Sequence, residues 1–398
     1  MRILFLFAPP IDPKRGGVER VTDVLADFFE KNGHKVFFLS RYSVDDGLFD
    51  DNRQFFVPDR RAFNIPENKK FFQDFLKKNK IDVVINQFAI NFDSFSLVKV
   101  AKCMGVKVIS VIHNAPLASV LNFTSSKFDL FKKYKITWLI NFFKSRCGEA
   151  ILKFIYKQRY AGLYKRVLTC SDCLFILSDK YKPQVDFFVG KRKIGNIIAM
   201  PNPIPFEKVE VDLSKKEKQV LFVSRMLYAQ KRPDFILYIW EKVYKYHKDW
   251  KLIVLGDGPY FSHFKNLAQK LKLRNIEIKG FVDPLDYYER ASILCMTSTY
   301  EGFPMTLNEC MQRAVVPMAF NSFAALTDII DNNVNGCIIK PFDLDEYAAK
   351  LSSLISNETV LRRFALNAVK KSESFELKEI GQKWITIMEG LIKSCQEG

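Results

Sequence analysis

The segment STYEGFPMTLNE carries two glutamates, Glu301 and Glu309, with seven residues between them. Pro304 suits the first turn of a helix, where its missing N–H costs nothing, so we expect a helix to begin there, just after Gly302 and Phe303. The free N–H groups of a helix N-terminus favour phosphate, and glycine lets a ligand approach the backbone closely. Glu309 could then accept hydrogen bonds from a ribose diol, and Glu301 from a second polyhydroxyl group. The segment predicts a site for a nucleotide-sugar.

A second pair of charged residues, Arg225 and Lys231, lies in SRMLYAQKRPD, directly after the apolar run QVLFVS. We expect Arg225 just beyond a strand and Lys231 at the opening of the next helix. Ligands of open α/β sheets bind at the carboxyl ends of strands, where an arginine fork and a lysine can neutralise a diphosphate and the charge that develops when it leaves. The alternative for both pairs is ordinary surface charge, with one glutamate countering a helix dipole.

A glycine-rich turn, GDGP at residues 256–259, precedes a predicted helix. Phe261 occupies the place where the third glycine of a dinucleotide-binding fingerprint belongs, so that fingerprint fails. We interpret the four residues as a strand-to-helix turn.

The elements that would position these residues alternate between strands and helices. After the first apolar run, the spacing of Val18, Val21, Leu25 and Phe29 predicts an amphipathic helix. This alternation is typical of parallel sheets covered by helices. The predicted strands are RILFLF, KVFFLS, DVVIN, KVISVIH and CLFIL before residue 200, and QVLFVS, KLIVLG, IEIKG, ILCMTS, VVPMAF and GCIIK after it.

The stretch MPNPIPF, residues 200–206, contains three prolines and precedes a charged run, which is typical of a linker. The alternation of strands and helices restarts after it. We therefore expect two doubly wound, Rossmann-like α/β domains, over residues 1–202 and 203–375.

Composition limits the class of protein and its partners. The chain has 398 residues, of which 48% are hydrophobic, and a formal net charge of +17. Such a chain is globular, and its charge implies an anionic partner: nucleic acid, a membrane face or a phosphorylated substrate. No nucleic-acid-binding motif is present, so we predict no nucleic-acid partner. No window approaches the ~18 apolar residues of a spanning helix, so we expect a cytoplasmic protein.

Residues 127–159 break the alternation. They hold nine Lys or Arg and two acids, with Phe128, Phe131 and Trp138 among aromatic residues at roughly helical spacing. This predicts a basic amphipathic insertion at about 120–165, which suits an anionic lipid surface and a peripheral position on the inner membrane face. The alternative is a surface helix whose apolar stripe packs on the core, with the Lys and Arg stems alongside.

Taken together, these motifs resemble the retaining family 4 glycosyltransferases. SRxxxxxK, GDGP and STYEGFPMTLNE followed by AVVPMAF match the donor domain of that family, and GGVER, the histidine after KVISVI and the PNP linker extend the resemblance over most of the chain. Residues 40–80 and 115–165 carry no shared motif. The resemblance implies the GT-B fold, two Rossmann-like domains facing each other across a cleft, with a C-terminal helix, residues 376–398, that crosses back to the first domain.

The resemblance also implies a role for each candidate residue. Arg225 and Lys231 would bind the donor diphosphate and help the nucleotide leave, Glu309 would bind the ribose, and Glu301 would contact the transferred sugar. His113 would lie near the reacting sugar, so the implied catalytic set is Arg225, Lys231, Glu301 and His113. Asp12 would touch the acceptor. The backbone around the donor would come from Gly16, Gly17, Gly302, Phe303, Pro304, Met305 and Thr306.

The implied activity is a retaining transfer of a sugar from a nucleotide-sugar, by preference a UDP-sugar, to a hydroxyl of a glycan or lipid-linked acceptor in surface polysaccharide or lipopolysaccharide assembly. No D-x-D motif lies near the site, so we expect neither a metal nor a cofactor. Two alternatives stay open. One is a GT-B nucleotide-sugar epimerase, and the other is a non-catalytic basic protein that binds membrane or nucleic acid.

Overall fold

The computed structural model describes residues 1–41, 51–121, 123, 136, 138–190 and 195–393. The chain forms two compact units. The first comprises residues 1–116, 151–205 and 376–398, and the second comprises residues 117–150 and 206–375. The division at 205/206 falls three residues after the expected one, and residues 117–150, expected in the first domain, group with the second unit.

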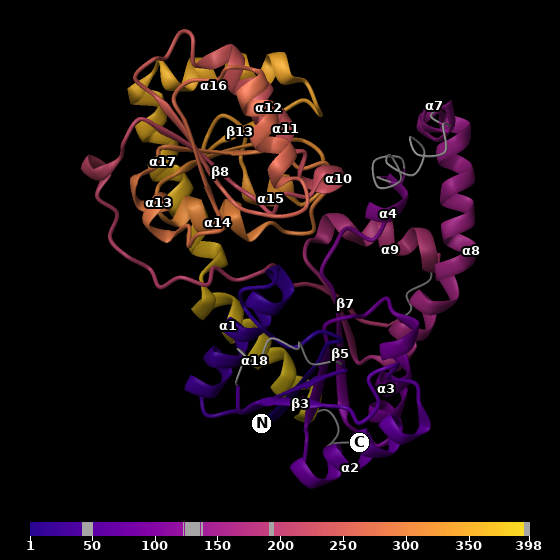
Figure 1. Cartoon of the computed structure of the whole chain (residues 1–398). Helices are drawn as coiled ribbons and strands as arrows, with labels where there is room; N and C mark the ends of the chain where they lie inside the picture. The colour runs from indigo at the N-terminus through magenta and orange to yellow at the C-terminus, as the bar shows by residue number, and fades with distance from the viewer. Residues whose placement is uncertain (42–50, 122, 124–135, 137, 191–194, 394–398) are drawn as a thin grey trace. The chain divides into compact units, whose positions relative to one another are not determined.

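The first unit is built on a parallel sheet in the order β3-β2-β1-β4-β5-β6-β7 (Figure 1). Its inner strands are continuous apolar runs because helices cover both faces of a parallel sheet. The two outer strands, β3 and β7, have three residues each and were not predicted. The strands are β1 (Arg2–Leu6), β2 (Lys35–Ser40), β3 (Gln54–Phe56), β4 (Val83–Asn86), β5 (Lys107–Ile112), β6 (Cys173–Ile176) and β7 (Ile197–Ala199).

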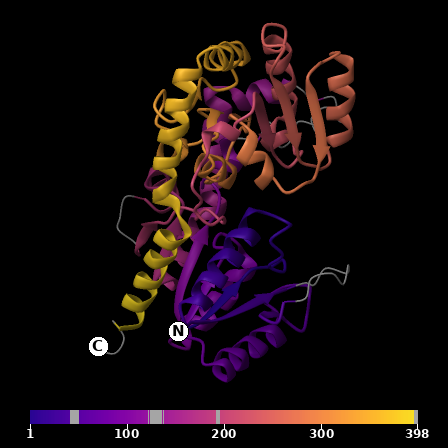
Figure 2. The ribbon, with the colours of Figure 1, turned by 90° about the vertical axis from the view of Figure 1, so that its left-hand side faces the viewer.

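Helix α1 (Gly17–Lys31) follows β1 and buries the face that its apolar spacing predicts, including Val21, Leu25 and Phe29. The last helix of the described chain, α18 (Leu377–Lys393), is drawn in yellow in Figure 2 and packs against α1. Its Trp384 lies against the rings of Phe29 and Phe175. The remaining helices are α2 (Pro66–Asn79), α3 (Phe92–Cys103), η1 (Asp179–Tyr181) and α9 (Lys182–Val189), together with α8 (Arg146–Cys170), most of which belongs to this unit.

The second unit contains a parallel sheet in the order β10-β9-β8-β11-β12-β13. Its core includes the fully buried side chains of Trp240, Phe222 and Tyr347. All six of these strands were predicted. They are β8 (Gln219–Val223), β9 (Lys251–Leu255), β10 (Ile276–Gly280), β11 (Ile293–Met296), β12 (Val316–Phe320) and β13 (Cys337–Ile339).

Helices flank these strands along the chain. They are α4 (Ala118–Leu121), α7 (Trp138–Lys144), η2 (Leu213–Lys215), α10 (Tyr228–Lys231), α11 (Pro233–Val243), α12 (Phe261–Lys270), α13 (Leu285–Arg290), α14 (Met305–Gln312), α15 (Leu326–Ile329), α16 (Leu344–Ile355), α17 (Glu358–Ser372) and η3 (Glu373–Phe375).

Each sheet has one point where the strand order reverses. In the first sheet, β1 lies between β2 and β4, and in the second, β8 lies between β9 and β11. The loops that leave β1 and β4, or β8 and β11, run in opposite directions at the carboxyl edge of the sheet. Open α/β sheets bind ligands at this place.

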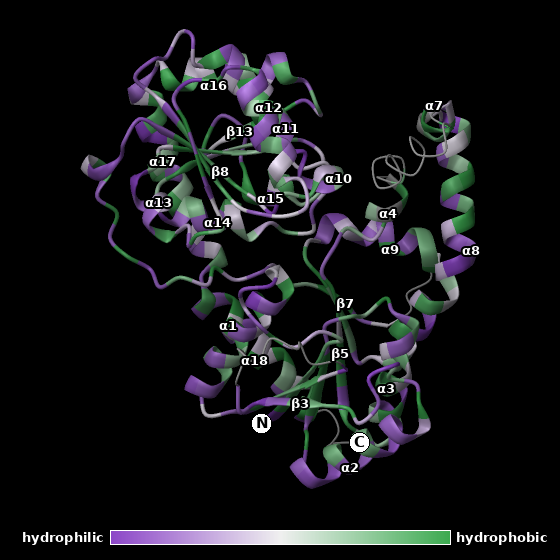
Figure 3. Cartoon of the chain, in the orientation of Figure 1, coloured by the Kyte–Doolittle hydropathy of each residue, from purple (hydrophilic) through white to green (hydrophobic). Residues whose placement is uncertain are grey.

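The basic segment forms two helices, α7 and α8, where it is described, and Phe128 and Phe131 lie outside the described residues. Helix α8 does not have one apolar face: Leu152 is buried, while Phe154 and Ile155 are 63% and 51% exposed. Apolar and polar bands alternate along α8 in Figure 3. Trp138 of α7 is 65% exposed. No helix in the described parts of the chain combines the length and hydropathy that spanning a bilayer requires.

Candidate functional site

Charged candidates of the second unit emerge from the two strands that flank its switch point. Arg225 comes two residues after β8 ends, and Glu301 comes five residues after β11 ends. Arg225 is exposed, and its guanidinium makes no hydrogen bond or ion pair with any residue that the structure describes. Its positive charge is therefore available to an anionic ligand at the carboxyl edge of the sheet.

Lys231 does not open the next helix, as the sequence predicts, but ends the single turn of α10. The cause is Pro233: the residue before a proline is disfavoured in the helical region, and Arg232 adopts φ 41° there, so that α11 begins anew at Pro233. The guanidinium of Arg232 is held by both carboxylate oxygens of Asp234, at 2.9 and 2.7 Å.

The structure brings Lys231 and Glu301 together. The Lys231 ammonium lies 2.5 Å from Oε1 of Glu301, and Gln230 Nε2 lies 3.4 Å from Oε2 of the same carboxylate. The Glu301 residue is only 6% exposed. A buried carboxylate is stable only when it is paired and hydrogen-bonded, and this pair meets that requirement. The fold thus joins two of the predicted site residues that are 70 positions apart in the chain.

Two threonines between β11 and Glu301 join this loop to α10. Thr297 donates its hydroxyl to the carbonyl of Lys231 at 2.8 Å, and Thr299 donates its hydroxyl to that of Ala229 at 2.9 Å. The Thr299 amide also donates to the Gln230 carbonyl, at 2.7 Å. These bonds satisfy carbonyls that a one-turn helix leaves unpaired, and they fix the backbone that carries Lys231.

Helix α14 begins at Met305, with Pro304 as its extended N-cap residue rather than its first helical residue. Gly302, Phe303 and Pro304 are buried, and the ring of Phe303 packs edge-on against that of Phe375 at 5.4 Å. Met305 and Thr306 are half-buried. The helix start predicted around Pro304 is thus correct to one residue.

Glu309 lies in α14 as predicted, but its side chain is fully buried. The hydroxyl of Tyr288, on α13, donates to Oε2 of Glu309 at 3.1 Å. Tyr288 is itself fully buried, and its carbonyl accepts a bond from the Lys216 ammonium at 2.7 Å. Contact between Glu309 and a ribose diol would therefore require the surrounding side chains to move.

The GDGP turn connects β9 with α12, as predicted. Gly256 and Gly258 have φ values of 138° and 145°, which L side chains rarely adopt. A Cβ on Gly256 would overlap the carbonyl of Ser224, and one on Gly258 would crowd the backbone of Met226. The amide of Met226 donates to the carbonyl of Asp257 at 2.8 Å. The turn supports the loop that carries Arg225.

In the first unit, the predicted glycines lie at the start of α1. Gly16 is the N-cap residue, with extended φ −169°, and Gly17 is the first helical residue. The space beside Gly17 is open, since a Cβ there would meet nothing within 4 Å. Asp12, in the loop between β1 and α1, accepts a bond from Arg15 Nε at 3.1 Å. This loop leaves the sheet at its switch point.

His113 directly follows β5 and is partly exposed. Its Nε2 lies 2.6 Å from Oε1 of Gln87, which directly follows β4. Burial of the ring lowers the pKa of His113 to about 4, since removing water disfavours the charged form. His113 is therefore neutral at physiological pH.

Sequence reasoning missed Gln87, Tyr288, Thr297 and Thr299. For Gln87 a signal existed, because it follows a predicted strand by one residue, as His113 does, and the two strands are neighbours. The contact between Tyr288 and Glu309 exists only once α13 and α14 pack together.

Among the described residues, no group of three or more His, Cys, Asp or Glu could hold a metal ion.

Comparisons with known proteins agree with this architecture. Residues 204–371 match the family model "Glycosyl transferases group 1", and residues 15–172 match "Glycosyltransferase Family 4". An uncharacterised glycosyltransferase of Haemophilus influenzae is 25% identical over 385 residues, which cover 94% of this chain and 96% of that protein.

Two further similar proteins have names that state a specific activity. A lipopolysaccharide 1,6-galactosyltransferase of Escherichia coli is 28% identical over 199 residues, which cover 48% of this chain and 54% of that protein. The crystal structure of the pneumococcal O-GlcNAc transferase GtfA, solved with UDP and GlcNAc, superposes with a TM-score of 0.73 at 13% identity, over 98% of this chain and 99% of that one. This last likeness is one of fold.

Proposed function

The chain belongs to the family 4 glycosyltransferases of the GT-B fold, and from this premise we propose that it is a retaining enzyme that transfers a sugar from a UDP-sugar to a hydroxyl of a glycan or lipid-linked acceptor. We place this activity in the assembly of surface polysaccharide or lipopolysaccharide. The E. coli relative named for lipopolysaccharide and the UDP bound to the structural neighbour support the substrates. The transferase names do not favour the epimerase alternative.

The observation that carries the proposal is the Lys231–Glu301 ion pair at the second switch point, with Arg225 on the loop that follows the neighbouring strand. The guanidinium of Arg225, which has no hydrogen-bond or ion-pair partner among the described residues, and the ammonium of Lys231 would supply the charge that a departing diphosphate needs. Glu301 holds the ammonium in place through one oxygen, and a carboxylate can accept from sugar hydroxyls as well. The backbone that leads to α14 contributes a helix N-terminus to the same loop.

The mechanism we propose is front-face transfer. The bond between the sugar carbon and the diphosphate oxygen breaks, and the oxygen of the acceptor hydroxyl forms a new bond to that carbon from the same face. The leaving phosphate oxygen takes the proton of that hydroxyl. Arg225 and Lys231 stabilise the negative charge on the departing diphosphate, so no enzymic nucleophile is required.

The test is release of nucleotide from purified protein incubated with a panel of UDP- and GDP-sugars. We expect one UDP-sugar to be hydrolysed slowly without acceptor, and Lys231→Ala to lower this rate by about 10²–10³-fold. The exposed Lys245 of the same unit provides a matched control, because Lys245→Ala removes one positive charge far from any predicted contact. Full activity in Lys231→Ala would contradict the assigned role.

We also propose that the protein associates with the inner face of a membrane through α7 and α8. The support is the exposure of Trp138, Phe154 and Ile155 among basic residues. Exposed apolar side chains among basic residues bind anionic lipid by apolar insertion and charge together. Flotation with anionic vesicles should recover the protein at low salt. If the protein stays unbound at low salt, it does not bind anionic lipid in this way.

A further inference from the structure

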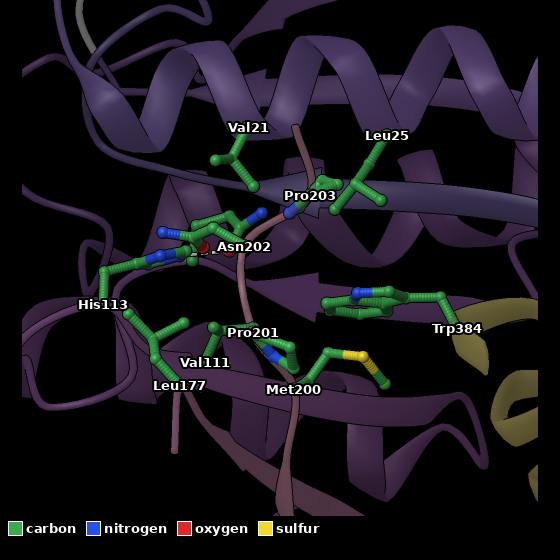
Figure 4. Close-up of a pocket in the computed structure, with 11 residues that line it drawn as sticks. Val21, Leu25, Val111, His113, Leu177, Met200, Pro201, Asn202, Pro203 and Trp384 are labelled. Atoms are coloured by element: carbon green, nitrogen blue, oxygen red, sulfur yellow. Dashed lines mark hydrogen bonds between the residues drawn. The ribbon is translucent and has the colours of Figure 1, made fainter. Parts of the chain in front are cut away.

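A chain of hydrogen bonds links His113 to helix α1 through two side chains. His113 Nε2 lies 2.6 Å from Gln87 Oε1, Gln87 Nε2 lies 2.9 Å from Thr22 Oγ1, and Thr22 Oγ1 lies 2.7 Å from the carbonyl oxygen of Val18. Thr22 is fully buried and Gln87 is 3% exposed. In Figure 4, the ring of His113 lies below Val21 of α1.

The direction of this chain can be deduced from its end. The Val18 carbonyl can only accept, so the single hydroxyl hydrogen of Thr22 is used there. Thr22 must then accept from the amide nitrogen of Gln87, which turns the amide oxygen of Gln87 toward His113. That oxygen can only accept, so the hydrogen must lie on His113 Nε2.

We infer that α1, through Thr22 and Gln87, holds His113 as the Nε2–H tautomer and so presents its Nδ1 as a hydrogen-bond acceptor for a substrate hydroxyl. Thr22 and Gln87 are then positioning residues. The part of the inference that concerns substrate rests on the proposed function; the tautomer does not. In this arrangement the Nδ1 atom of His113 accepts a hydrogen bond or a proton from the substrate and does not donate one.

The surroundings of the ring keep it neutral. With Gln87, it lines a small pocket whose other lining residues are Val21 and Leu25 from α1, Val111 from β5, Leu177 after β6 and Trp384 from α18, together with Met200, Pro201, Asn202 and Pro203 of the linker. None of these side chains is titratable or charged, and Gln87 is neutral too. Burial alone lowers the pKa of His113 to about 4, so its charged form is absent near neutral pH.

Helix α1 also begins at Gly16 and Gly17, the residues proposed to approach the donor phosphates. Val18 lies in the first turn of that helix and Thr22 one turn later. The same rigid element therefore sets the position of the glycine backbone and the orientation of the imidazole. A substrate that contacts both would experience one preorganised surface.

The decisive measurement is ¹⁵N NMR of the histidine rings, which distinguishes the two neutral tautomers and the imidazolium directly. The chain has four histidines, and His113→Asn identifies the signals of interest. We expect the Nε2–H pattern, unchanged from about pH 5.5 to about pH 8.5. An Nδ1–H pattern, or titration within that range, overturns the inference.

Two variants test the chain of bonds. Gln87→Glu puts a carboxylate on Nε2, which favours the imidazolium and should raise the pKa of His113 into the measured range. The kcat/KM of this variant should then fall as the pH is lowered through the new pKa, because imidazolium cannot accept. Gln269→Glu, on the exposed face of α12, makes the same substitution elsewhere and should leave the pH profile unchanged.

Thr22→Val removes the anchor while keeping the shape of the side chain. We expect a second tautomer pattern for His113 and a fall in kcat/KM on the order of five- to tenfold. Thr386→Val is the matched control, because Thr386 also donates to the carbonyl four residues earlier but is exposed.

The possible failures are distinguishable. If neither Gln87→Glu nor Thr22→Val changes kcat/KM or its pH profile, the role of Nδ1 is overturned. If the wild-type protein turns over no nucleotide-sugar, the proposed function and the substrate contact fall together, while NMR still decides the tautomer.

Discussion

The two bases proposed to hold the diphosphate have different surroundings. Lys231 is fixed by Glu301 at 2.5 Å, whereas the exposed guanidinium of Arg225 makes no hydrogen bond or ion pair within the described residues. The charge of Lys231 is partly compensated before a ligand arrives, and that of Arg225 is not. We therefore expect Arg225 to supply most of the new electrostatic stabilisation.

Replacing Arg225 tests this directly. Arg225→Ala should lower kcat/KM by about 10²–10³-fold, and Arg225→Lys should recover only part of the loss, because an ammonium lacks the bidentate fork. The free energy of unfolding should change by less than about 0.5 kcal/mol, since the exposed side chain packs against little. Equal activity in Arg225→Ala and wild type would remove Arg225 from the site.

Tyr288 provides a second prediction about a single residue. Tyr288→Phe removes the hydroxyl that donates to the buried Glu309, so we expect the free energy of unfolding to fall by about 1–3 kcal/mol, measured by urea titration. Tyr287→Phe, on the same helix but partly exposed, should have little effect. An equal loss in both variants would show that the hydroxyl of Tyr288 does not stabilise the fold through Glu309.

The sequence predicted which residues of the second unit lie at the edge of the sheet, because Arg225 and Glu301 follow recognisable apolar strands. It did not predict that Lys231 and Glu301 form an ion pair, since their contact depends on β8 and β11 being neighbours. Tyr288 was missed for the same reason, because its partner Glu309 lies in another helix, whereas Gln87 directly follows a predicted strand and could have been found. The roles of all these residues in binding and catalysis stay predictions.

Among the elements, the apolar runs identified every strand of the second sheet and the inner strands of the first. The three-residue outer strands β3 and β7 were missed. Each is defined by pairing with a single neighbouring strand, which the sequence does not show, although β7 lies in the apolar run IIAM at 197–200. Helix α10 was missed too. A single turn has no periodicity, and it exists here because Thr297 and Thr299 bind its carbonyls.

The GDGP turn gives a prediction for an element. Gly256→Ala should destabilise the second unit by about 1–3 kcal/mol, because the new methyl overlaps the Ser224 carbonyl and φ is 138°. Gly162→Ala, in the middle of α8, should instead stabilise by about 0.4–1 kcal/mol, since nothing lies within 4 Å of the new methyl. Thermal unfolding measures both, and a neutral Gly256→Ala would mean that the turn relaxes.

For the whole molecule, the division into two units predicts separable stabilities. Trp384→Ala should lower the stability of the first unit by about 3–5 kcal/mol, because it removes a buried indole between Phe29 and Phe175. Trp240→Ala, in the core of the second unit, should do the same there. Hydrogen exchange followed by mass spectrometry should show faster exchange confined to the unit that carries each change. Equal loss of protection in both units would mean that they unfold together.

Helix α18 contributes Trp384 to a core that begins with β1, so the first unit joins the two extremes of the chain. During translation, residues 2–205 leave the ribosome long before residues 377–393 are made. Until then, the rings of Phe29 and Phe175 lack the contact with Trp384. The second unit, complete at residue 375, can mature earlier. The half that is synthesised first is therefore the half that finishes last, and a chain released prematurely before α18 would hold one mature unit and one exposed core.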